Sequence, residues 1–381
     1  MVLDEHERRA WAYLSAVAEP PSAALRTLIA DVGVREAAKA VATRVVPSGH
    51  AGVLALTEAR HGVNTAAEDL GTVARLGGRL VTPDDAEWPG WQLLALSKAD
   101  TAAKGGEPLA LWVRGPAQLD EVVDRSVAIV GSRAASGYGE HVTALMSNGL
   151  AAESWSVVSG GAYGIDGVAH RNVLACEGIT VAVLACGIDR DYPAGHARLL
   201  SEIARTGMVV SEYPPGTTAA KHRFLTRNRL VAALSAAVVV VEAGQRSGAA
   251  NTAAWARKLG TPLGAVPGPV TSATSVGCHR MIADGVAQLV TDSRDVLRLA
   301  QPEGANATVS EAGPLGRRTD DLDADQLRVY DAVPAAGTLT IGEISFACGL
   351  EVRKVRSALA VLEARGLLDT NGSGWRLTRG R

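Results

Sequence analysis

Two stretches near the middle of the chain decide the fold: Val127-Ala-Ile-Val-Gly-Ser-Arg133 and Ser156-Val-Val-Ser-Gly-Gly-Ala162. Each is a short run of apolar or small residues, followed by a glycine-rich turn and then by a helical pattern. Similar runs follow at 180–184, 208–211, 237–241 and 262–266. Several runs are apolar throughout, which is typical of strands covered on both faces, and strands that alternate with helices predict a doubly wound, parallel α/β sheet. Ligands of such sheets bind beyond the carboxyl ends of the strands, so we expect the functional site in the loops there.

The regions on either side of these runs have different patterns. Residues 1–75 are rich in Ala and Leu at helical spacing, which predicts a helical domain (SAM or helix-hairpin-helix-like) before a sheet domain at 76–300. Residues 301–322 are rich in Pro, Gly, Asn and charged residues, which predicts a flexible linker. Residues 323–381 read as three helices and a β-hairpin, the element order of a winged helix.

Composition excludes several classes of protein. With 381 residues, 47% of them hydrophobic and 20% charged, the chain can bury a sizeable core and is not a disordered chain. A net charge of −2 excludes a histone-like cation but not a local basic groove. The four cysteines have no Cys-x-x-Cys spacing, which disfavours a zinc site or a disulfide framework and suits a reducing cytosol. The charged N-terminus and the lack of any run of ~18 apolar residues predict a cytoplasmic protein without a membrane segment. We expect neither a metal nor another cofactor.

The loop after the first run is the first candidate for an anion site. Glycines such as Gly131 allow close approach to a phosphate, the N–H groups of the following helix favour an anion, and Ser132 and Arg133 supply donors. The loop is neither a Walker A motif nor a dinucleotide fingerprint, because Arg133 stands where that fingerprint has its second glycine. The alternative is a tight strand-to-helix turn with a solvated arginine.

Two further loops follow predicted strands. The first runs from Ser159 and Gly160 to Asp166, which we expect to cap the next helix, with His170 partly buried rather than acting as its acid–base partner. In the second, Ser247 and Gly248 begin a helix, again a possible anion site.

The segment Lys221-His-Arg-Phe-Leu-Thr-Arg-Asn-Arg229 is the most unusual part of the chain. It holds four cations without one carboxylate, together with Phe224, one of only two phenylalanines. Cations that follow a backbone beside an aromatic face are what a binder of single-stranded nucleic acid needs. The alternative is a solvated basic helix with Phe224 packed inward and with Arg227 and Asn228 supporting the sheet.

Together these motifs resemble those of a known family, the bacterial DNA-processing protein A (DprA/Smf) family. The motifs are Ala128-Ile-Val-Gly-Ser-Arg133, Ser159-Gly-Gly-Ala-Tyr-Gly-Ile-Asp166, Gly187-Ile-Asp-Arg-Asp-Tyr-Pro193, Ser211-Glu-Tyr-Pro-Pro-Gly216, Phe224-Leu-Thr-Arg-Asn-Arg229, Val241-Glu-Ala, Ser247-Gly248 and Val266-Pro-Gly268. The resemblance spans about residues 127–299. It implies an extended Rossmann-like domain that binds single-stranded DNA, forms a homodimer and loads the recombinase RecA during natural transformation, without catalysis.

The resemblance also implies roles for individual residues. Gly131, Ser132 and Arg133 meet phosphate, and Lys221 and Phe224 match the Lys-x-x-Phe element of the family. Other positions implied as DNA-binding are Ser159, Gly160, Arg227, Asn228, Arg229, Ser247 and Gly248, with Arg227 and Arg229 extending the basic surface. The chain departs from the family at Tyr163, where members usually carry Arg, so that Tyr163 either weakens phosphate contact or stacks on a base.

Two other functions stay open. Nucleotide phosphoribohydrolases of the lysine-decarboxylase-like family share a related fold, but Trp255 stands where their catalytic glutamate should be, and tryptophan cannot do acid–base chemistry. A winged-helix transcription regulator is suggested by Arg353, Lys354 and Arg356 on the predicted third helix of the C-terminal domain, although Glu351 and Glu363 make its charge mixed.

Overall fold

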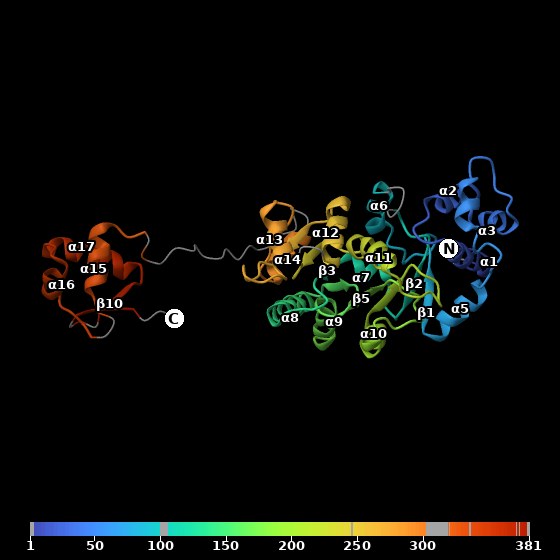
Figure 1. Cartoon of the computed structure of the whole chain (residues 1–381). Coiled ribbons are helices and arrows are strands. Elements are labelled where there is room, and N and C mark those ends of the chain that lie inside the picture. Colours follow the sequence, from blue (N-terminus) through green and yellow to red (C-terminus); the bar gives the residue numbers. More distant parts are fainter. Residues whose placement is uncertain are drawn as a thin grey trace. The chain divides into compact units, whose positions relative to one another are not determined.

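The computed structural model describes residues 4–99, 106–244, 247–301, 319, 321–334, 337–370, 372 and 374–378. The chain divides into two compact units, Met1–Ala305 and Asn306–Arg381 (Figure 1). Each unit has its own hydrophobic core. The predicted linker lies almost wholly outside the described residues.

The larger unit is built on a nine-stranded sheet with the order β1-β2-β6-β5-β4-β3-β7-β8-β9. The strands are β1 (Gly78–Val81), β2 (Leu111–Arg114), β3 (Ser126–Val130), β4 (Ser156–Ser159), β5 (Thr180–Leu184), β6 (Met208–Ser211), β7 (Ala237–Val240), β8 (Leu263–Ala265) and β9 (Gln288–Leu289). All pairs from β6 to β9 along this order are parallel, whereas β1 pairs with β2 and β2 with β6 in antiparallel fashion. The predicted α/β class with a mostly parallel sheet is therefore confirmed.

Helices cover both faces of this sheet (Figure 1). One face carries α6 (Gly90–Lys98), α7 (Leu119–Asp124), α11 (Lys221–Ala233) and α12 (Gly248–Leu259). The other carries α8 (Gly137–Ala152), α9 (Ile165–Ala175), α10 (Ala197–Thr206) and α14 (Ser293–Ala300). The short helix α13 (Val276–Ala283) follows β8. Burial on both faces explains why the central runs, such as Ala237–Val240, are apolar at every position.

The order of the strands places the site. From β3 the chain winds outward through β4 and β5 to β6, and it then crosses back along α11 to enter β7 on the other side of β3. The loops after β3 and β7 therefore diverge at a topological switch point, where doubly wound sheets form their ligand-binding crevice.

The helices at the N-terminal end pack against the antiparallel edge of the sheet. They are α1 (Glu5–Val17), α2 (Ala23–Val32), α3 (Val34–Thr43), α4 (Gly52–Thr57) and α5 (Ala66–Arg75). Their apolar side chains share one core with Trp112 of β2 and Leu200 of α10.

Glu19, just after α1, connects these helices to α11. Its carboxylate accepts hydrogen bonds from Arg223 Nε and Nη2 at 2.6 and 3.0 Å, from His222 Nε2 at 3.1 Å and from Arg60 Nη2 at 3.1 Å. Partial burial alone would raise the pKa of the Glu19 carboxyl, but these hydrogen bonds and the charge of Arg223 outweigh it and hold the pKa at about 2. The first turn of α11 is therefore fixed by an ionised group from the N-terminal helices.

The smaller unit has three helices and a hairpin. They are α15 (Ala324–Ala332), α16 (Ile341–Cys348), α17 (Val352–Ala364), β10 (Leu368–Thr370) and β11 (Trp375–Leu377). Leu339 adds a bridge to Trp375 beside the hairpin. This is the element order of the predicted winged helix.

Candidate nucleic-acid interface

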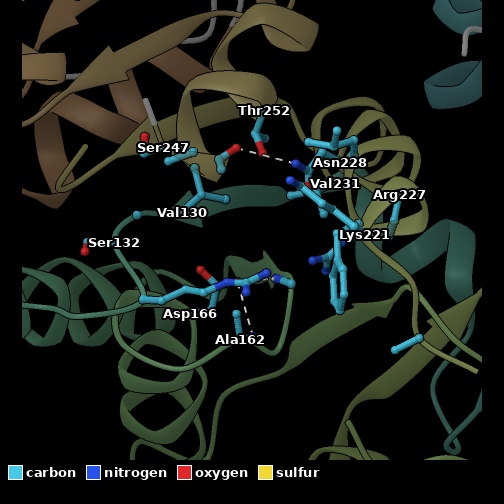
Figure 2. A pocket seen from close by; sticks show the side chains of 18 of the residues that line it. Val130, Ser132, Ala162, Asp166, Lys221, Arg227, Asn228, Val231, Ser247 and Thr252 are labelled. Carbon is cyan, nitrogen blue, oxygen red and sulfur yellow. Dashed lines mark hydrogen bonds between the residues drawn. The ribbon is translucent and has the colours of Figure 1, made fainter. Parts of the chain in front are cut away.

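A cavity of about 870 Å³ opens at the carboxyl ends of the central strands. Figure 2 shows Ser132 and Lys221 on opposite sides of it, and Asp166, Asn228 and Ser247 also line it. Among the predicted site residues, the cavity is lined by Gly131, Ser132, Arg133, Gly160, Lys221, Phe224, Arg227, Asn228, Ser247 and Gly248. Segments up to 117 residues apart in sequence thus meet at the switch point.

Two of the cations at the cavity are unpaired. Arg133 and Lys221 are exposed, and within the part of the chain that the structure describes no carboxylate lies within ion-pair distance of either. The guanidinium of Arg133 lies over the ring of Phe224, 5.2 Å from its centroid. Phe224 is half-buried and lines the cavity beside both cations, rather than being sealed in the core.

The floor of the cavity carries two buried ionisable side chains, those of Asp166 and Arg227. Asp166 accepts hydrogen bonds from the backbone N–H groups of Gly160 and Ala162, at 3.1 and 3.4 Å. Arg227 donates Nη1 to the Val183 carbonyl, and its Nε has no partner among the described residues. Burial raises the pKa of the Asp166 carboxyl and lowers that of the Arg227 guanidinium, and each charge partly offsets the other.

Gly160 lies in close contact with the Arg227 guanidinium. A Cβ at this position would lie 2.3 Å from Arg227 Nη1 and 2.7 Å from its Cζ. The guanidinium therefore lies directly against the backbone of the loop after β4, and a side chain at residue 160 would have to displace it.

Two helices begin at the cavity. The first residues of α11 and α12, Lys221 and Gly248, both line it, and Ser247 caps α12 by accepting a hydrogen bond from Ala250 N. Asn228 Nδ2 donates to Asn251 Oδ1 at 3.1 Å, which leaves its carbonyl oxygen for a ligand. The N-terminal ends of both helices favour a negative charge in the cavity.

The helix after β3 does not offer such a site, contrary to the sequence-based expectation for the loop at Gly131. Glu242, buried at the end of β7, accepts hydrogen bonds from Ser136 N at 3.0 Å, from Ser136 Oγ and from Thr274 Oγ1 at 2.9 Å. Since Ser136 is the N-cap of α8, a carboxylate of the protein already occupies this helix terminus. The N-terminus of α8 is therefore not free for a further anion.

Three predicted site residues lie away from the cavity lining. The Ser159 hydroxyl is buried and donates to the Ile129 carbonyl at 2.6 Å. Tyr163 is 48% exposed, but its ring packs edge-on against His196, with centroids 4.7 Å apart. Arg229 does not extend a basic surface, because it is fully buried in an ion pair with Glu212. These positions support the site or lie beside it.

The prediction for Asp166 and His170 needs a correction as well. The N-cap of α9 is Gly164, and Asp166 holds the preceding loop instead of capping the helix. His170 is fully buried, with Nδ1 2.7 Å from Thr180 Oγ1, and burial lowers its pKa to about 3, so that the ring is neutral.

The basic segment 221–229 is only partly a ligand-binding surface. Arg223 is paired with Glu19, Arg227 is buried in the cavity floor and Arg229 is paired with Glu212. The acids that balance these cations come from distant parts of the sequence, so the absence of carboxylates within the segment was misleading. Lys221 is the cation of this segment that lies exposed at the cavity.

Tyr192 was missed as a site residue by the sequence analysis. It lines the cavity, and its ring centroid lies 5.4 Å from that of Phe224. Trp255, which stands in place of the hydrolase glutamate, is buried in the core on α12. Among the described residues, no group of His, Cys, Asp and Glu is arranged to hold a metal ion, and no helix is long and apolar enough to cross a bilayer.

Comparisons with known proteins point to one family. The model of the family DNA recombination-mediator protein A matches residues 79–301. A putative DNA processing protein DprA of Mycobacterium tuberculosis is 52% identical over 373 residues, which cover 97% of this chain and 94% of that protein. The DNA processing protein DprA of Streptococcus pneumoniae is 40% identical over 190 residues, or 50% of this chain and 66% of that protein. The X-ray structure of DprA from S. pneumoniae is similar with a TM-score of 0.62 at 28% identity, covering 78% of this chain and 98% of that one.

Proposed function

The chain belongs to the DNA recombination-mediator protein A (DprA/Smf) family, and from this premise we propose that it binds single-stranded DNA in the cavity described above. It protects the strand and passes it to the recombinase RecA, acting in the cytoplasm as a homodimer and without catalysing a reaction. The cavity is the DNA site, and the winged helix is a separate accessory domain.

One observation carries this proposal: two unpaired cations and an aromatic ring from different elements meet at one cavity. Arg133 comes from the loop after β3, whereas Lys221 and Phe224 come from the first turn of α11. Cationic side chains neutralise backbone phosphates and release counterions, and an aromatic ring stacks on a base of any sequence. This combination suits a polynucleotide better than a free anion.

The concave shape of the site favours an unpaired strand. A base enters the cavity only when its faces and edges are free, and in a duplex both are occupied by stacking and pairing. The carbonyl oxygen of Asn228 then accepts a hydrogen bond from the base, while Arg133 and Lys221 hold the flanking phosphates.

A gel-shift comparison of single-stranded and double-stranded oligonucleotides of the same sequence tests this function. We expect the full-length protein to retain the single strand at concentrations at which the duplex runs free. Equal retention of both would contradict the proposal.

Incubation with AMP tests for hydrolase activity. The proposal predicts no released adenine, because Trp255 provides no acid–base group at the position of the hydrolase glutamate. Sustained release of adenine would favour the phosphoribohydrolase alternative.

A further inference from the structure

Tyr192 lies at the cavity and is not accounted for by the site described so far. Its side chain is 44% exposed, and the residue lines the cavity together with Phe224 and Arg133. No hydrogen bond of its hydroxyl is found within the described part of the chain, so the side chain has no evident structural task. An exposed aromatic ring beside a cationic cavity is a stacking surface for a nucleobase.

Phe224 alone does not provide enough free ring surface. The guanidinium of Arg133 lies 5.2 Å from its centroid, and the ring of Tyr192 lies 5.4 Å from it at an interplanar angle of 45°. Phe224 thus contacts both Arg133 and Tyr192. Of the two rings, that of Tyr192 is more open to solvent, since Phe224 is half-buried.

The loop that carries Tyr192 is held in place from several directions. Gly187 N donates to the Thr217 carbonyl at 2.9 Å, and Asp189 Oδ1 accepts from Gly216 N at 2.9 Å. Arg190 Nε donates to the Gly216 carbonyl at 3.0 Å, and Asp191 pairs with Arg114 at 3.7 Å. Because the four contacts hold the residues just before Tyr192, the ring is positioned before a ligand arrives, which lowers the entropy cost of stacking.

We propose that Tyr192 is a second stacking position, which binds the base next to the one that enters the cavity. This inference rests on the proposed binding of single-stranded DNA. The ring centroids lie 5.4 Å apart, so two successive bases of one strand can each meet one ring. The smallest ligand that fills the site is therefore a dinucleotide unit.

Fluorescence anisotropy with labelled oligo-dT tests the position. Tyr192→Ala should weaken binding by about 5- to 150-fold, the loss expected when one base–aromatic stack is removed. The slope of affinity against salt should not change, because no charge is removed. Tyr192→Phe, which keeps the ring, should bind like the wild type.

Trp91→Ala is the matched control. Trp91 is also an exposed aromatic residue, 83% against 44%, but it does not line the cavity, so its loss should leave the affinity unchanged. If Tyr192→Ala binds oligo-dT as tightly as the wild type, the second stacking position is wrong while the proposed function stands. If the wild type itself fails to bind oligo-dT, both the second stacking position and the proposed function are wrong.

Photocrosslinking of the wild type gives a test that is independent of any variant's folding. After irradiation with oligo-dT that carries 5-iodouracil, we expect mass spectrometry to find an adduct on Tyr192. Adducts on Tyr163 or elsewhere, with none on Tyr192, would overturn the inference.

Discussion

Replacing Arg229 with alanine lowers the free energy of unfolding of the larger unit by about 3–5 kcal/mol. The Arg229 guanidinium is fully buried and donates to both carboxylate oxygens of Glu212, at 2.8 and 2.7 Å, and to the Gly106 carbonyl at 3.1 Å. Without Arg229 the Glu212 carboxylate stays buried and unpaired, which is the costly outcome for such a pair. Urea unfolding followed by tryptophan fluorescence measures the loss, since every tryptophan except Trp375 lies in this unit.

Two further variants make this prediction specific. Arg294→Ala removes an arginine whose ion pair with Asp292 is exposed, and such pairs contribute about 0–1 kcal/mol. The double variant Arg229→Met with Glu212→Leu removes both buried charges and should recover most of the lost stability. An Arg229→Ala protein as stable as Arg294→Ala would show that the pair does not anchor α11.

Gly164→Ala is expected to damage both stability and DNA binding. Gly164 has φ +74°, and a Cβ there would lie 2.2 Å from the Ser132 carbonyl oxygen and 2.6 Å from that of Arg133. The backbone conformation alone costs an alanine about 1–3 kcal/mol, and the clash with backbone atoms adds to it. Relief of the clash displaces the loop with Ser132 and Arg133, so the affinity for oligo-dT should fall as well.

Gly137→Ala is the matched control for this variant. Gly137 begins α8 in the same region, and a Cβ there would have no neighbour within 4 Å. Because alanine favours a helix over glycine, this variant should be as stable as the wild type or slightly more stable, with unchanged DNA binding. If Gly164→Ala unfolds at the same urea concentration as Gly137→Ala and also binds oligo-dT as tightly, Gly164 does not shape the loop.

Much of the central fold could be predicted from sequence because the information is local. A buried parallel strand such as Thr180–Leu184 is apolar from Val181 onward, and Gly187 lies in the loop that follows it. The edge strands β1 and β9, and β2 next to β1, were not predicted. They have two to four residues each, and their pairing depends on neighbours that are distant in the chain.

Site residues could be predicted where they lie together in one segment of the sequence. Contacts between side chains from distant segments could not be predicted. The Lys221 and Phe224 pair stands within one helical turn, and both residues line the cavity. In contrast, the carboxylate at the start of α8 comes from Glu242, 106 residues after its partner Ser136. The partner of Arg223 is Glu19, 204 residues away. No local pattern indicates either pairing.

The salt dependence of oligo-dT binding tests the central claim most directly, namely that Lys221 neutralises a phosphate at the cavity. We expect log affinity to fall linearly with log salt in the wild type, and the slope to become shallower by about 0.7 in Lys221→Ala. Lys98→Ala removes the same charge from an exposed lysine outside the cavity lining, and it should keep the wild-type slope. Equal slopes for Lys221→Ala and Lys98→Ala would contradict the account.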